Sequence, residues 1–469
     1  MESRAKSLLG LLKFFRPHTS GASMTIVRLI RKSIGALSVA AFASVVTFNA
    51  SAAPVTIEFW HSMTGDKGKL LEELVNQFND QATIKDRLKV NLTYVGTYTD
   101  GINKVRTSLI ANKGPHLAQI FEIGTQVMID SGAITPLEDL AAGDKEFGMD
   151  QMLPQVLQYY KVGGKLYSLP FATSNPIIYY NADWFKKAGI AAPPKTFEEL
   201  VTISEKLTDK KQKTSGITWP LNAWFFEQFM ARQGAVLIDE NNGRSGRAQK
   251  ANFASAEGIR YVEWISGMAK SGAFANVGRD WDPPVQNFQA SRSAMLITST
   301  SDVFVISEKS PFKVLTAPLP VPAGMEKTPG GTIIGGNSLW VLKAKPMAEQ
   351  KLAYEFLKFM ASEKTQTTWH TKTGYFPIRK DVIAALVKDG FYKKNPNALT
   401  AIDQLVNSAQ VPATQGALMG VFPEAREHVE TAIEEVLAGK STATKSLQNA
   451  ADRTGKSLAR YNKMQIARK

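Results

Sequence analysis

The sequence has 469 residues and no cysteine, with 44% hydrophobic and 21% charged residues, a composition typical of a globular protein. Its 56 basic and 42 acidic residues give a formal net charge of +14. The basic residues are scattered and not clustered with aromatics, which argues against a nucleic-acid-binding surface. The absence of cysteine excludes a disulfide framework, and a chain of this length can bury enough surface to fold without one.

The N-terminal segment has the pattern of an export signal. Arg28, Arg31 and Lys32 precede an apolar run at 34–48, which is followed by small residues ending in an A-x-A site at 50–52. The run is shorter than the roughly 20 residues that a spanning helix needs, so cleavage is favoured over a retained membrane anchor. We therefore predict a signal peptide at 1–52.

Met24 gives a signal of ordinary length and is the favoured start, with Met1 as the alternative. Removing residues 1–52 takes away seven Lys/Arg and one Glu, leaving 49 basic and 41 acidic residues and a net charge of +8. No cysteine stands at the cleavage site to carry a lipid. The expected product is free in the periplasm.

Strand-like and helix-like segments alternate along the rest of the chain, which predicts a layered α/β architecture. The first predicted strand, at 55–60, alternates apolar and polar residues, and a helix with an apolar stripe at 70–78 follows it. The pattern then repeats to the C-terminus. Further strands are expected at 88–94, 117–121, 176–180, 293–298 and 335–342, and further helices at 102–110, 182–188, 197–207, 254–271, 348–362, 423–437 and 444–461. Residues 239–246 are expected to form a surface loop.

No pattern in the sequence requires an enzyme. The five histidines form no close pair at metal-ligand spacing, and Gly439-Lys440-Ser441 lacks the first glycine of a phosphate-binding loop. We predict no catalytic residue, no metal and no cofactor. An exported phosphodiester hydrolase built from residues distant in sequence stays a disfavoured alternative.

Five motifs together carry a family resemblance. They are FWHSM at 59–63, PIIYYN at 176–181, IGGNSLWV at 334–341, WHTKTGYFPI at 369–378 and GFYKKNP at 390–396. In this order they resemble the periplasmic sn-glycerol-3-phosphate-binding proteins of ABC transporters, within extracellular solute-binding protein family 1. The WHTKTGYFPI motif is the most specific of the five.

The resemblance implies a two-lobed periplasmic binding protein fold of the α/β class, with discontinuous lobes joined by hinge strands. The N-terminal lobe would comprise 53–137 and 314–362, and the C-terminal lobe 138–313 and 363–469. A monomer would close on its ligand by hinge motion and then dock on the membrane subunits of its ABC transporter.

The resemblance also implies the ligand-binding residues, and the family pattern gives distinct roles to some of them. Glu122 would accept hydrogen bonds from glycerol hydroxyls, the backbone at Gly336 would approach an anion, and Arg426 would bind the phosphate through its planar fork. The remaining implied residues are Tyr98, Ser174, Ser299 and Tyr375, with Trp219 and Trp224 as an apolar wall.

One segment departs from the family pattern. The family spaces two tryptophans as G-W-x-x-W, whereas Trp219 and Trp224 are further apart here and follow Thr218. This leaves open whether the ligand is sn-glycerol 3-phosphate or a larger diester such as glycerophosphocholine, whose quaternary ammonium could rest on tryptophan. A neutral-oligosaccharide binder of the same fold is the nearer alternative, and Arg426 is the residue expected to distinguish the two.

Overall fold

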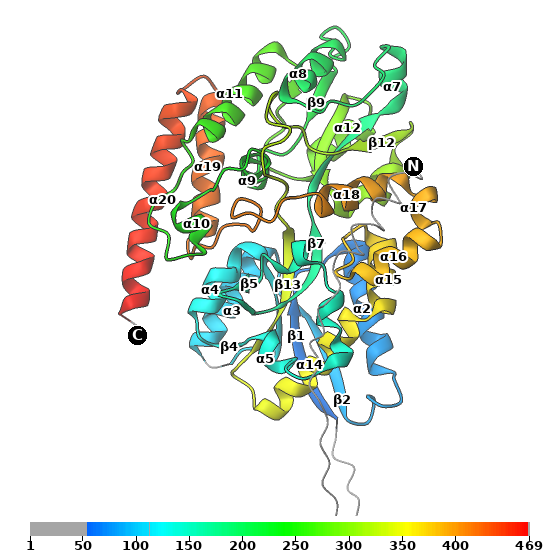
Figure 1. The fold of residues 1–469 in the computed structure, drawn as a ribbon, viewed down its shortest axis with the longest axis vertical. Helices are drawn as coiled ribbons and strands as arrows, with labels where there is room; N and C mark the ends of the chain where they lie inside the picture. Colours follow the sequence, from blue (N-terminus) through cyan, green and yellow to red (C-terminus); the bar gives the residue numbers. More distant parts are fainter. Residues whose placement is uncertain (1–53, 112, 468–469) are drawn as a thin grey trace, which may run out of the picture.

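The computed structural model describes residues 54–111 and 113–467, so the predicted signal peptide lies outside the described residues. Two β-sheets form the centres of two halves of the molecule, one below and one above in Figure 1. Among the described helices, none combines the length and the hydropathy of a membrane-spanning segment.

The first sheet has six strands in the order β2-β1-β3-β13-β4, with β7 also pairing β13. Strands β1, β2 and β3 are parallel, while β13 runs antiparallel to β3, β4 and β7. Alternate residues of β1 point into the core, as the period of two in the sequence predicts. The strand bounds are β1 (Val55–His61), β2 (Leu88–Tyr94), β3 (Leu117–Phe121), β4 (Ile134–Thr135), β7 (Leu169–Ser174) and β13 (Gly335–Leu342).

The second sheet has five strands in the order β10-β9-β11-β8-β12. Its middle strands β11 and β8 are buried along their whole length because helices pack over the sheet. The bounds are β8 (Pro176–Asn181), β9 (Ser215–Thr218), β10 (Phe274–Ala275), β11 (Ser293–Ser299) and β12 (Val314–Ala317), and a separate hairpin joins β5 (Lys161–Val162) to β6 (Lys165–Leu166).

Helices cover both sheets (Figure 1). Those of the first half are α2 (Gly65–Asn79), α3 (Tyr98–Ile110), α4 (Thr125–Asp130), α5 (Leu137–Leu140) and α14 (Met347–Ala361). Those of the second half are α7 (Ala182–Lys187), α8 (Phe197–Lys206), α9 (Ala223–Arg232), α10 (Asp239–Gly243), α11 (Ala256–Ser271), α12 (Asp282–Gln289), α13 (Val303–Lys309), α18 (Pro396–Val406), α19 (Phe422–Leu437) and α20 (Ala443–Ile466). The remaining helices are α6 (Pro154–Leu157), α15 (Glu363–Thr373), α16 (Lys380–Lys388) and α17 (Phe391–Lys394).

The chain crosses between the halves more than once. The first crossing joins β7 to β8 through Asn175, which is fully buried, and the second joins β12 to β13. Asn175 donates from Nδ2 to Thr332 Oγ1 at 2.8 Å, and its carbonyl accepts from Thr300 N at 2.9 Å. The crossing segments are therefore tied to each other, and each half is discontinuous in sequence. This is the two-lobed α/β fold with hinge strands that the family resemblance implied.

The strand pairing corrects two details of the sequence analysis. The expected N-terminal lobe resumed at residue 314. Residues 314–317 instead form β12, which pairs antiparallel with β8 in the second sheet, so the chain returns to the first half only after β12. Conversely, β7 pairs with β13 in the first sheet although it falls within 138–313. The other lobe boundaries stay a prediction.

The expected surface loop at 239–246 lies at the surface except for Asn242 and contains the short element α10. Its residues 240–242 adopt left-handed backbone angles within α10, and the Asn242 side chain is buried, with Oδ1 accepting from Leu237 N at 2.6 Å. Arg244 donates to the carbonyls of Gly416 and Tyr159. The segment therefore fastens the chain near 415 to the second half.

Candidate ligand-binding cleft

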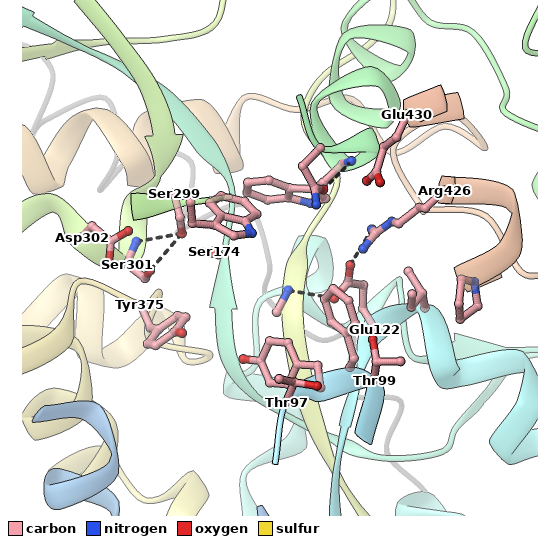
Figure 2. A pocket seen from close by; sticks show the side chains of 18 of the residues that line it. Thr97, Thr99, Glu122, Ser174, Ser299, Ser301, Asp302, Tyr375, Arg426 and Glu430 are labelled. Atoms are coloured by element: carbon pink, nitrogen blue, oxygen red, sulfur yellow. Dashed lines mark hydrogen bonds and ion pairs between the residues drawn. The ribbon is translucent and has the colours of Figure 1, made fainter. Parts of the chain in front are cut away.

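A cavity of about 600 Å³ lies between the two halves, a size that suits a small ligand. Figure 2 shows Ser299, Ser301, Asp302 and Tyr375 on one side of it, and Arg426 and Glu430 on the other. Eight of the nine implied ligand-binding residues line it: Tyr98, Glu122, Ser174, Trp224, Ser299, Gly336, Tyr375 and Arg426. Trp219 does not.

Three of these residues stand at strand ends. Glu122 directly follows β3, Ser174 is the last residue of β7, and Ser299 is the last residue of β11. Strand ends meet at the edges of the two sheets that face each other, which is where an α/β fold leaves polar side chains free for a ligand. Ser299 also accepts from Ser301 N at 3.1 Å and so begins the short 3₁₀ turn Thr300–Asp302.

Two tyrosines are held in the cleft by aromatic stacking. Tyr98 begins α3 behind a capping box made by Thr97, and its ring stacks on Phe121 with centroids 4.7 Å apart. Tyr375 follows the C-terminus of α15 and stacks on Trp369 at 5.8 Å. Each ring is fixed by its neighbour, so both hydroxyl groups are positioned before a ligand arrives.

Arg426 is buried in the first turns of α19, and two of its three guanidinium nitrogens donate to carboxylates. Its Nε and Nη2 donate to the two oxygens of Glu227 at 2.6 and 3.0 Å, and Nη2 donates to Glu122 Oε1 at 2.8 Å. The bidentate side of the guanidinium, which was expected to bind phosphate, is therefore occupied by Glu227. The contact to Glu122 joins the second half of the molecule to the first.

Burial raises the pKa of Glu122 to about 7, although the positive charge of Arg426 acts in the opposite direction. Burial alone would lower the pKa of Arg426, but the carboxylates of Glu227 and Glu122 raise it above its ordinary value. Arg426 therefore stays charged, and one of its two buried carboxylates, Glu122, is poised to change charge near neutral pH.

Gly336 contributes differently from what was expected. Its N–H donates to Glu122 Oε2 at 3.0 Å, so the anion that its backbone approaches is a carboxylate of the protein. Its φ of +106° and the nearby carbonyl of Ala172 leave no room for a Cβ. Gly336 thus helps to hold the Glu122 carboxylate in place.

The aromatic wall differs from the expected pair. Trp219 is fully buried, contacts Phe274 with centroids 4.4 Å apart, and donates to Tyr261 OH at 3.4 Å, so it belongs to the core of the second half. Trp224 lines the cavity together with Trp281, with centroids 5.6 Å apart. Residue spacing alone gave no sign of Trp281.

The cleft also contains charged and polar residues that the sequence did not predict, chief among them Lys67, Ser301, Asp302 and Glu430. Glu430 could have been found, since it stands four residues after Arg426 and so shares its helix face. Lys67 stands four residues after the FWHSM motif, but no other feature of the sequence marks it as a ligand-binding residue. In the described part of the chain, no group of three or more His, Cys, Asp or Glu side chains could hold a metal ion.

A match to a protein family and the similarity to individual relatives identify the class of protein. The family model of the bacterial extracellular solute-binding proteins matches residues 73–400, and the chain belongs to this family. It is accordingly a periplasmic binding protein and not an enzyme.

Individual relatives narrow the class. The sn-glycerol-3-phosphate-binding periplasmic protein UgpB of Escherichia coli K12 is 34% identical over 417 residues, covering 88% of this chain and 94% of its own. The UgpB structure of Mycobacterium tuberculosis in complex with glycerophosphocholine is 22% identical with a TM-score of 0.71, over 87% of this chain and all of that one. The sugar-binding protein MalE of Xanthomonas citri has a TM-score of 0.72 at 20% identity, over 87% and 99%. The structural similarities establish the two-lobed fold.

Proposed function

We propose that this chain is the periplasmic substrate-binding component of an ABC importer for sn-glycerol 3-phosphate and glycerophosphodiesters. The observation that carries the proposal is a cleft with hydroxyl groups and Lys67 at one end and carboxylates beside two tryptophans at the other. A phosphate ester needs donors for its oxygens, and the alcohol that it carries needs acceptors. The closed protein then delivers the ligand to the membrane subunits of its transporter.

The charge of the cleft favours a diester with a cationic head over a dianionic monoester. Two basic side chains and five acidic ones line the cavity. Trp224 and Trp281 lie beside the acidic end, to which Asp282 and Glu430 belong. An aromatic wall next to carboxylates suits a quaternary ammonium group. Glycerophosphocholine, the ligand in the related UgpB structure, has this chemistry.

The glycerol part would bind between these ends, at Glu122. Each oxygen of this carboxylate already accepts one hydrogen bond and has capacity for another, so it can still accept from ligand hydroxyls. Arg426 Nη1 makes no hydrogen bond to the described residues and is the guanidinium nitrogen left for a ligand. A buried carboxylate rejects an apolar analogue that would leave it unpaired.

A neutral oligosaccharide is disfavoured, but not for the reason that the sequence offered. Arg426 was expected to mark a phosphate site, yet its charge is matched by Glu227 and Glu122. The preference for a phosphate ester is better supported by the hydroxyl cluster around Ser299 and by Lys67.

Calorimetry on the purified periplasmic form tests the proposal, with glycerophosphocholine, sn-glycerol 3-phosphate, glycerol and maltose as ligands. We expect saturable binding of the two phosphate esters, tighter for the diester, and none for maltose. Dissociation constants weaker than about 1 mM for both esters, equivalent to only about 4 kcal/mol, would refute it. Release of glycerol 3-phosphate from the diester by pure protein would instead revive the hydrolase.

A further inference from the structure

Lys67 bridges the cleft at the end opposite Arg426. Its Nζ donates to Ser301 Oγ at 3.0 Å and to Asp302 Oδ1 at 2.8 Å, and lies 5.0 Å from the centre of the Tyr375 ring. Lys67 comes from α2 in the first half, whereas Ser301 and Asp302 follow β11 in the second. Two hydrogen bonds leave one of its three N–H donors for a ligand.

The hydroxyl groups around Lys67 are suited to phosphate oxygens. Ser299 Oγ donates to Ser301 Oγ at 3.0 Å, and Ser301 Oγ donates to Asp302 Oδ1 at 3.3 Å. Ser174 lines the same cavity without a side-chain hydrogen bond to any described residue. All three serines are more than nine-tenths buried. A buried hydroxyl without a partner, such as that of Ser174, is costly unless a ligand completes its hydrogen bonds, and the hydroxyl groups of Ser299 and Ser301 can rotate to donate to a phosphate oxygen instead.

The two cations of the cleft differ in how their charge is matched. Arg426 faces two carboxylates that are almost completely buried, and Glu227 occupies the side of its fork that would take a bidentate anion. Lys67 faces one carboxylate, that of Asp302, whose side chain is 32% exposed and is therefore partly screened by water. An anion consequently meets less opposing charge at Lys67 than at Arg426.

We propose that Lys67 binds the phosphate of the ligand and is the residue that selects for a phosphate ester over a neutral polyol. This inference rests on the proposed function and concerns the same cleft. The phosphate would lie between Lys67 of one half and Ser299 and Ser301 of the other, so its binding also favours the closed arrangement.

The test compares Lys67→Met with the matched control Lys69→Met, which removes an exposed lysine from the same helix. Dissociation constants for glycerophosphocholine and glycerol are measured by calorimetry. We expect Lys67→Met to weaken glycerophosphocholine about 10- to 100-fold, as for a charge-assisted hydrogen bond, while glycerol and the control change less than about threefold. Lys67→Arg should restore most of the affinity. Unchanged thermal midpoints would verify folding, since the Lys67–Asp302 pair is partly exposed.

Asp302→Asn separates ligand contact from a simple bridge between the halves. If Lys67 binds phosphate, removing the competing carboxylate leaves glycerophosphocholine affinity unchanged or tighter. Equal weakening by Asp302→Asn and Lys67→Met would overturn the inference, as would a Lys67→Met protein that binds like the wild type. Failure of the wild type to bind either phosphate ester refutes the proposed function itself, and the inference with it.

Discussion

Glu122→Gln should change how stability depends on pH. The pKa of Glu122 is about 7 in the folded protein and 4.5 as the reference, and its side chain is 2% exposed. Between these values the folded state holds a proton that the unfolded state has lost. The free energy of unfolding therefore falls as pH rises from about 4.5 to 7 and is level above that.

The difference between 4.5 and about 7 corresponds to about 3 kcal/mol, because one pKa unit is worth about 1.4 kcal/mol. A glutamine side chain cannot ionise, so the variant lacks this loss. Relative to the wild type, the variant should gain about 3 kcal/mol between pH 4.5 and pH 8. Its absolute stability also reflects the hydrogen bonds from Arg426 and Gly336, which is why the slope is the informative quantity.

Urea unfolding followed by tryptophan fluorescence, at about five pH values spanning this range, measures the difference. Burial lowers the pKa of His370 to about 4, which gives a slope of the opposite sign, but that slope is common to both proteins and cancels. Glu424→Gln, which removes a carboxylate from the exposed first turn of α19, is the control. A difference between wild type and Glu122→Gln that stays constant within about 0.5 kcal/mol refutes the reasoning.

Three further substitutions test the assignment of residues. Trp219→Ala should lower the free energy of unfolding by about 3–5 kcal/mol, as for a core tryptophan, and a stable variant in urea would contradict its place in the core. Trp281 is 39% exposed, so Trp281→Ala should change the free energy of unfolding by less than about 1 kcal/mol. The same substitution should weaken the affinity for glycerophosphocholine about 5- to 30-fold by calorimetry, and an unchanged affinity would remove Trp281 from the site. Asp130 links the two halves through a bidentate pair with Arg247 and a hydrogen bond from Tyr461. Asp130→Asn weakens these contacts, so we expect a larger radius of gyration in solution scattering without ligand, and an unchanged radius would exclude a role of Asp130 in closure.

Local pattern was sufficient for most of the longer helices and strands, although it missed others such as β7, α15 and α18. The predicted strand at 88–94 is β2 without change, and the helix expected at 348–362 is α14 at Met347–Ala361. Such segments carry their period in consecutive residues, so they can be read without knowing what they pack against. Pairing of β12 with β8 has no such local signature, which is why the lobe boundary at 314 was misplaced.

The candidate site was only partly predictable. The family resemblance predicted eight residues that line one cavity, although Tyr98 and Tyr375 are 277 positions apart in the sequence. Trp219 was misassigned because a tryptophan at a strand end is equally suited to a cleft and to a core, and only packing decides. Trp281 was missed because nothing in its local sequence shows that folding brings it beside Trp224 in the cleft.

The sequence by itself therefore determined many of the periodic elements, and with the family resemblance it predicted the two-lobed fold and eight of the residues that line the cleft. Only the tertiary structure decided which charges neutralise one another. Glu227 meets Arg426 across 199 residues, and Lys67 meets Asp302 across 235. Ion pairing depends on sheet order and on the crossings between halves, and no local period encodes these. That long-range pairing moved the expected phosphate position from Arg426 to Lys67.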